Sequence, residues 1–314
     1  MLAPPKFHHL HLNSIAPDAA VDFYTSHFAT CRRTSWAGLP AVRTGNDVLL
    51  VFTQVDTPPL RDAQTAIDHF GWHVTDSRAC LETFVANNEQ AVLPLFTGEA
   101  GETVLISSDT WPGRDGVNGL TASQIAEAKS QGLQPTRNAG FGFLAAPDGA
   151  IVEFLGKHPV ERFNHVHMFQ DDVYCALLWY QTRLNAPVFE DRGPQIPITE
   201  DTCRVARGPD PTWPALQKEG LIRSPRAAVQ LGEVTLTWYP VQGQAPLASS
   251  RGHACDHIGL AVNDLDPWIM KLRKEQVQFL EQEYRVGNHR AVLIEGPSKE
   301  AIEIFEIRNK SPST

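Results

Sequence analysis

Short strings of alternating apolar and polar residues recur along the chain. Residues 7–12 and 163–168 alternate with a period of two, which is typical of strands, and they match at an offset of 156 residues. In the first string this alternation places Phe7, His9 and His11 on one face of the predicted strand. A match of this kind at a long offset indicates an internal duplication.

Two further pairs of strings support the duplication. Residues 68–76 and 256–264 share the pattern D-H-x-G-x-x-V-x-D. Residues 147–153 and 297–303 each read as a turn followed by an apolar strand, with a glutamate six residues after the proline. Helices are predicted after the first four strings, over residues 17–24, 79–87, 171–180 and 268–275. Each half of the chain therefore reads as strand, helix and further strands, twice.

The repeats predict two modules of similar construction. We expect an N-terminal module over residues 1–157, a C-terminal module over residues 160–308 and a tail over residues 309–314. Unequal distances between the matching strings place an insertion at about residues 110–138 in the first module and at about residues 191–225 in the second. Long insertions of this kind serve either as lids and binding loops or as surface decoration.

Composition restricts the partners of such a protein. The chain has 314 residues, 42% hydrophobic and 20% charged, which is an ordinary globular balance. Its 27 basic and 36 acidic residues give a formal charge of −9 without basic runs, which argues against nucleic-acid binding. No apolar stretch approaches the roughly 20 residues of a membrane helix. We therefore expect a small-molecule substrate, no nucleic acid and no membrane, and we leave a homodimer open.

The N-terminus and the cysteines bear on the compartment. The first residues lack a basic segment followed by an apolar one, which favours a cytoplasmic location, although a signal peptide replaced by the initiator Met stays open. Five scattered cysteines without a CxxC pair are typical of buried thiols in a reducing compartment rather than of disulfides or a zinc knuckle.

Both halves keep two histidines and a glutamate at matching places in separate strands, and these six residues are the candidate metal ligands. Two imidazoles and one carboxylate form a facial triad, which leaves coordination positions open for water, substrate or oxygen. A structural zinc site would be closed by four ligands, usually with thiolates, and no cysteine matches between the halves. The candidate ligands are His9, His69, Glu153, His165, His257 and Glu303.

The ordered strings resemble the vicinal oxygen chelate superfamily, which includes glyoxalase I, bleomycin resistance proteins and the extradiol dioxygenases. The resemblance covers nearly the whole chain and implies an α+β fold of four βαβββ units forming two tandem cups. It implies a divalent metal in each cup, with His9, His69 and Glu153 in one site and the other three ligands in the second. The string that begins at Pro297 departs from the family pattern, because Ser and Lys follow the proline.

Three further histidines share a strand face with a proposed ligand. His11, His73 and His167 lie two or four residues from one, so they are candidates for catalytic proton carriers, for substrate contacts or for support of a ligand. Of these, His11 and His167 are the candidate general bases.

The resemblance leaves three functions open. Glyoxalase I adds a carboxylate ligand on the last strand of its first unit, and residues 48–53 and 234–239 offer none, which favours a dioxygenase with Fe²⁺. The dioxygenases normally have a tyrosine four residues before the closing proline, where Phe143 and Leu293 stand, which argues against ordinary catechol cleavage. An isomerase or lyase with Zn²⁺, Ni²⁺ or Mn²⁺ is the alternative. The second alternative is a non-catalytic resistance protein, against which the two intact triads count.

Overall fold

Two large mixed sheets form the framework of the protein. The structure is a computed structural model that describes residues 2–62, 64–86, 95–97, 103–105, 127–133, 141–189, 197–204, 226–241 and 246–307. The strand orders are β14-β15-β16-β13-β1-β4-β3-β2 in the terminal sheet and β11-β12-β10-β5-β9-β8 in the central sheet. Strands β6 and β7 pair only with each other in the described part of the chain. The expected α+β fold is confirmed, and each of the four repeats begins with a strand followed by a helix.

The elements follow the predicted repeats closely. The first unit contains β1 (Lys6–Ser14), α1 (Pro17–His27), β2 (Arg32–Trp36), β3 (Leu39–Arg43) and β4 (Leu49–Gln54). The second contains β5 (Ile67–His73), α2 (Ser77–Ala86), β6 (Leu95–Thr97), β7 (Thr103–Leu105), β8 (Phe141–Ala145), the turn η1 (Pro147–Gly149) and β9 (Ile151–Leu155). The third contains β10 (Arg162–Gln170), α4 (Val173–Arg183), β11 (Ala227–Leu231) and β12 (Val234–Pro240). The fourth contains β13 (Cys255–Val262), α5 (Asp266–Lys274), β14 (Phe279–Val286), β15 (His289–Glu295) and β16 (Ala301–Glu306). The predicted insertions lie largely outside the described residues.

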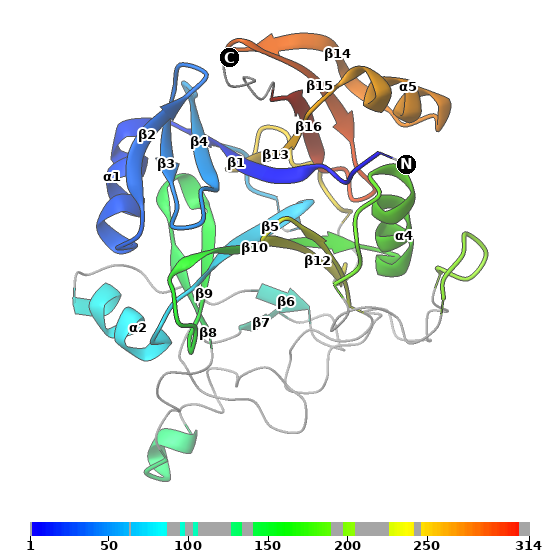
Figure 1. Cartoon of the computed structure of the whole chain (residues 1–314). Helices are drawn as coiled ribbons and strands as arrows, with labels where there is room; N and C mark the ends of the chain where they lie inside the picture. Colours follow the sequence, from blue (N-terminus) through cyan, green and yellow to red (C-terminus); the bar gives the residue numbers. More distant parts are fainter. Residues whose placement is uncertain are drawn as a thin grey trace.

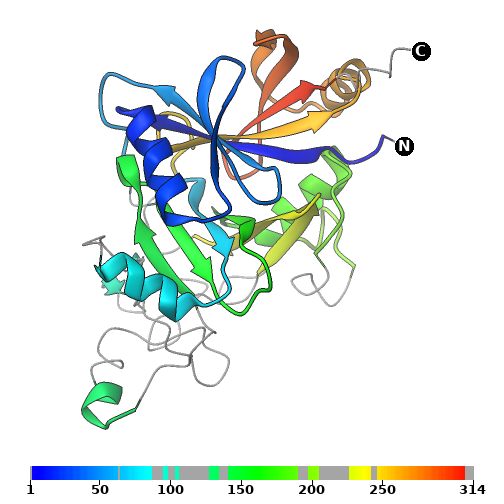
Figure 2. The same cartoon turned by 60° about the vertical axis from the view of Figure 1, so that its left-hand side comes forward.

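The sheets do not follow the two halves of the chain. Strand β1 of the first unit pairs antiparallel with β13 of the fourth, and β10 of the third pairs antiparallel with β5 of the second. Figures 1 and 2 show the first unit in blue beside the fourth in orange, and the second and third units together below them. The expectation of one cup over residues 1–157 and another over residues 160–308 is thus corrected. The first strands of all four units carry similar patterns, so the pattern alone does not decide which of them pair.

A β-bulge changes which side chains share a face of β1. Phe7 pairs with Leu260 and His9 with Gly259, so His8 is an extra residue between them. Phe7 therefore faces the core shared by the two sheets, where its ring stacks on Phe163 with centroids 5.7 Å apart. The expectation that Phe7 shares a face with His9 and His11 is wrong. The same irregularity in β10 makes Asn164 the extra residue.

Two cysteines are joined in the structure. Cys175 of α4 and Cys203 form a disulfide, whereas Cys31, Cys80 and Cys255 are free. The expectation of thiols alone is therefore wrong, because residues far apart in sequence meet only in the fold. Disulfides are typical of oxidising compartments, so this bond does not support the cytoplasmic prediction. No described helix is long and apolar enough to cross a membrane.

Candidate metal sites

The central site lies in the central sheet and gathers three strands around one carboxylate. His69 on β5, Glu153 on β9, and His165 and His167 on β10 are buried, with ligand atoms that all lie within 4.8 Å of one another. Glu153 Oε2 lies 3.0 Å from His69 Nε2 and 2.9 Å from His165 Nε2. One carboxylate oxygen is thus shared by two imidazoles.

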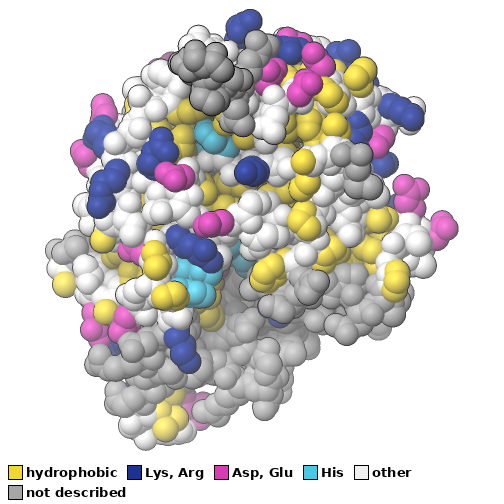
Figure 3. All heavy atoms as spheres, viewed as in Figure 1, with side chains coloured by type: hydrophobic (Ala, Val, Ile, Leu, Met, Phe, Trp, Pro, Cys, Tyr) yellow, Lys and Arg dark blue, Asp and Glu magenta, His cyan; other side chains and the backbone are white. Residues whose placement is uncertain are grey.

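The terminal site is its counterpart in the terminal sheet. The ligand atoms of His9 and His11 on β1 and of His257 on β13 lie within 4.8 Å of one another, and all three residues are buried. Glu303 on β16 completes the site, with Oε1 3.7 Å from His9 Nε2. Its other oxygen accepts a hydrogen bond of 2.6 Å from the Tyr284 hydroxyl. Figure 3 shows histidine side chains, in cyan, at the surface in two separate places, one in the upper and one in the lower half of the view.

All six predicted ligands therefore cluster, but not in the predicted sets. His9 lies with His257 and Glu303, and His165 lies with His69 and Glu153. The expected grouping by halves of the chain is corrected, because the first strand of one unit pairs with the D-H-x-G strand of another.

Glycines of the repeated pattern make room for this grouping. His165 pairs with Gly71 and His9 with Gly259 across the strands. A Cβ atom added at Gly71 would lie 2.2 Å from the nearest atom of the His165 ring, and one at Gly259 would lie 1.9 Å from that of His9. Each imidazole therefore lies directly against the backbone of the partner strand, where only glycine leaves space.

The residue before each of the four ligand histidines holds its ring through Nδ1. The distances from Nδ1 are 2.6 Å to Asp68 for His69, 2.7 Å to Asp256 for His257, 2.8 Å to Asn164 for His165 and 3.1 Å to His8 for His9. Such a partner fixes the tautomer and leaves Nε2 free to bind a metal. Sequence reasoning missed this shared feature, although the signal was a polar residue directly before every one of the four histidines.

The terminal site contains buried atoms that fit a cation. His9 Nε2, His11 Nδ1, His257 Nε2 and Glu303 Oε1 have no hydrogen-bond partner among the described residues. Buried polar atoms without a partner are costly, and a divalent ion bound among them would remove that cost. Neutral imidazole and carboxylate are ligands that suit Fe²⁺, Zn²⁺, Ni²⁺ and Mn²⁺. The residues present therefore fit a divalent metal.

The two sites differ in their electrostatics. Burial alone would lower the pKa of His69, but hydrogen bonds to Asp68 and Glu153 raise it to about 9. Burial would raise the pKa of Glu153, yet the hydrogen bonds and charges of His165 and His69 hold it well below its ordinary value. In the terminal site burial dominates, so the pKa of His9 falls and that of Glu303 rises.

The candidate proton carriers occupy different surroundings. The His11 ring stacks on His257 with centroids 4.2 Å apart, and its Nε2 lies 2.7 Å from Thr53 Oγ1. Burial lowers the pKa of His11 most, and the charges of His257 and Arg251 lower it further. Both His11 and its counterpart His167 therefore lie within the clusters, and their catalytic roles stay predictions.

His73 is separate from the central cluster. Its ring stacks on His158 with centroids 3.3 Å apart, and no metal-binding cluster found among the described residues includes it. Burial and the charge of His158 lower the pKa of His73 to about 3. The geometry therefore gives no support to a catalytic role for His73, which stays a prediction.

The described residues of β4 and β12, the parallel neighbours of β1 and β10, place no carboxylate beside the histidines, as the sequence indicated. Leu49 and Val51 of β4 lie opposite His9 and His11, and Thr235 and Thr237 of β12 lie opposite His165 and His167. No described residue at these register positions adds a fourth ligand of the glyoxalase type. A tyrosine missed by sequence reasoning, Tyr284, does reach Glu303, from β14 rather than from the expected position on β15.

Comparison with known proteins supports the fold. No protein-family model and no curated protein sequence matches the chain. Among solved structures, glyoxalase I from Zea mays aligns with a TM-score of 0.58 and 12% identity, covering 96% of this chain and 92% of that one. A putative dioxygenase from Bacillus subtilis aligns with a TM-score of 0.56 and 9% identity, covering 98% and 86%. The chain has the vicinal oxygen chelate fold that these proteins share.

Proposed function

We propose that this chain, which has the vicinal oxygen chelate fold, is a divalent-metal-dependent enzyme acting on a small substrate with two neighbouring oxygens. The observation that carries the proposal is the set of four buried ligand histidines, each held through Nδ1 by the residue before it. Nε2 of His69 and of His165 lies at Glu153, and Nε2 of His9 lies 3.7 Å from Glu303. A protein that only sequesters a ligand has no use for two such sets. This counts against the resistance-protein alternative.

A dioxygenase with Fe²⁺ is the reaction we favour. Fe²⁺ held by two imidazoles and one carboxylate would supply open positions for both substrate oxygens and for O₂. In the terminal site Tyr284 donates to one oxygen of Glu303 and leaves Oε1 facing His9. The chain itself therefore orients a single carboxylate oxygen toward the site.

His11 is placed to accept a proton from a substrate hydroxyl. Its lowered pKa keeps the imidazole neutral near neutral pH, and its Nδ1 has no partner among the described residues. The Thr53 hydroxyl lies at the other ring nitrogen and can accept the Nε2 hydrogen, so the ring is oriented to take up a proton at Nδ1. His167 occupies the matching position in the central site.

An isomerase or lyase with Zn²⁺, Ni²⁺ or Mn²⁺ is the second candidate. The observation that favours it is the third histidine of each cluster, His11 or His167, because a fourth protein ligand beside two histidines and a glutamate would leave fewer open positions for O₂. His11 or His167 would then be a ligand, and proton transfer would need another base.

Metal analysis and oxygen uptake test the proposal. Protein purified without added metal is expected to contain a divalent ion, and activity lost to a chelator is expected to return when metal is restored. Catechols, hydroquinones and α-ketoaldehyde adducts should be tested with an oxygen electrode. Turnover without O₂ uptake would favour the isomerase, whereas the absence of both bound metal and metal-dependent turnover would contradict the enzyme proposal.

A further inference from the structure

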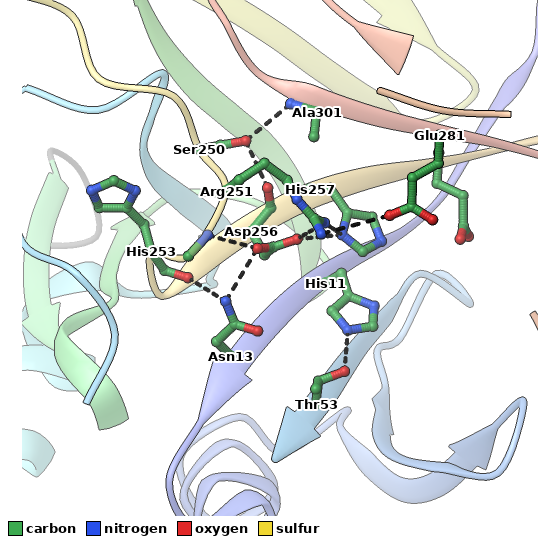
Figure 4. A network of polar contacts seen from close by, with 12 residues as sticks. His11, Asn13, Thr53, Ser250, Arg251, His253, Asp256, His257, Glu281 and Ala301 are labelled. Atoms are coloured by element: carbon green, nitrogen blue, oxygen red, sulfur yellow. Dashed lines mark hydrogen bonds and ion pairs between the residues drawn. The ribbon is translucent and has the colours of Figure 1, made fainter. Parts of the chain in front are cut away.

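A positively charged side chain stands beside the terminal site on the loop before β13. The loop is fixed by Ser250, which is buried, accepts a hydrogen bond of 2.9 Å from Ala301 N and donates one of 2.6 Å to the Asp256 carbonyl. Gly252 N donates to Asp256 Oδ2 at 2.9 Å. These bonds fix the backbone on both sides of Arg251, as Figure 4 shows.

Arg251 uses one edge of its guanidinium to hold the site. Nη1 donates to Asp256 Oδ1 and lies 3.5 Å from His257 Nδ1. Nη2 lies 4.0 Å from Glu281 Oε1, too far for a hydrogen bond, and the side chain is 43% exposed. No described residue accepts a hydrogen bond from Nε or Nη2. The second edge of the guanidinium is therefore available to a ligand.

The acidic partner of Arg251 is already occupied by other donors. Asp256 is buried and also accepts hydrogen bonds from His257 Nδ1, Gly252 N and Asn13 Nδ2, the last at 3.2 Å. The guanidinium has five N–H donors, so its second edge still offers donors to an anionic group.

The central site has no such charge at the matching position of the sequence. Arg251 stands five residues before Asp256, and Ala63 stands five residues before Asp68 in the other copy of the D-H-x-G pattern. At this position of the pattern the two copies therefore differ in one cationic residue.

We infer that Arg251 determines the specificity of the terminal site by binding a carboxylate that the substrate carries beside its two chelating oxygens. The planar guanidinium can bind a carboxylate through two parallel hydrogen bonds, which gives both affinity and orientation. This inference rests on the proposed function, because it assumes that the same site binds a chelating substrate.

A catechol with a free carboxylate and the same catechol with that group esterified test the inference. Protocatechuate carries a carboxylate and two vicinal hydroxyls, and its methyl ester has the same hydroxyls without the charge. Both are titrated by calorimetry into zinc-loaded His69→Ala protein, in which only the terminal site is intact. We expect protocatechuate to bind about tenfold more tightly than the ester, because a charge-assisted hydrogen bond is gained.

Arg251→Gln, loaded with zinc to full occupancy, is expected to lose this preference through weaker protocatechuate binding, and Arg33→Gln, which removes an exposed arginine paired with Asp18 and Asp22, should keep it. The inference would be overturned if Arg251→Gln still preferred protocatechuate by the same factor, or if the protein with Arg251 intact showed no preference. In either case, binding of the ester would still support the proposed function. A joint loss of zinc and ester binding in Arg251→Gln would also overturn it, because Arg251 would then only position Asp256. Failure of both ligands to bind the zinc-loaded protein would contradict the proposed function itself.

Discussion

The central and terminal sites have matching ligands but stabilise them in different ways. In the central site Glu153 accepts hydrogen bonds from two imidazoles, so its charge is balanced by protons within the cluster. In the terminal site Glu303 receives its hydrogen bond from Tyr284, and His9 Nε2 has no partner among the described residues. The comparison shows that one sequence pattern can yield a charge-paired cluster in one cup and desolvated neutral groups in the other.

The largest effect is expected from filling the space beside one ligand. Gly259→Ala places a methyl group where the His9 ring lies, and Gly71→Ala does the same to His165. Each change should displace its own imidazole, and metal content by mass spectrometry should fall by about one ion per chain, on the expectation that a three-ligand site does not tolerate a missing imidazole. The unaltered site is the internal control, so loss of both ions from either variant would contradict the independence of the sites.

A smaller effect is expected when a ligand keeps its place but loses its partner. Asp256→Asn and Asp68→Asn each weaken the acceptor at Nδ1 of one histidine, which typically lowers metal affinity about 10–100-fold. Competition with a chromophoric chelator would measure both affinities in each variant. If Asp256→Asn weakened the central site instead, the assignment of Asp256 to His257 would be incorrect.

A third contrast concerns the contacts between the sheets. Glu300 before β16 is buried and accepts a hydrogen bond of 2.7 Å from Tyr180, whereas Ala150 stands at the matching position and the Tyr24 hydroxyl has no partner among the described residues. Burial raises the pKa of Glu300 to about 7 from 4.5, although the hydrogen bonds from Tyr180 and the backbone oppose this rise. Between pH 4.5 and about pH 7 the folded state therefore binds more protons than the unfolded state.

This raised pKa makes stability fall as pH rises. The contribution of Glu300 is fully present below the unfolded pKa of about 4.5 and is lost as pH rises through about 7, a loss of about 3 kcal/mol. Glu300→Gln should remove this slope in denaturant unfolding while metal content stays unchanged. Asp18→Asn, which alters an exposed carboxylate, should preserve the slope; an unchanged slope in Glu300→Gln would show that another group causes it.

The sequence predicted the fold and all six clustered residues because the chemistry repeats in both halves. It did not predict their grouping, because β1 and β10 carry the same pattern and either can pair with a D-H-x-G strand. The bulge residues His8 and Asn164 were missed for a related reason, since alternation assumes an unbroken strand. Arg251 and Tyr284 belong to a loop and a strand that reach the site only in three dimensions.

Metal content of two double variants tests the central claim most directly, namely that the first and fourth units build one site and the second and third build the other. His9→Ala with His257→Ala removes two ligands of the terminal site, so this variant should keep about one ion per chain, as each single variant does. His9→Ala with His69→Ala removes a ligand from each site and should keep none. The reverse result, with one ion kept by the second variant and none by the first, would contradict the account.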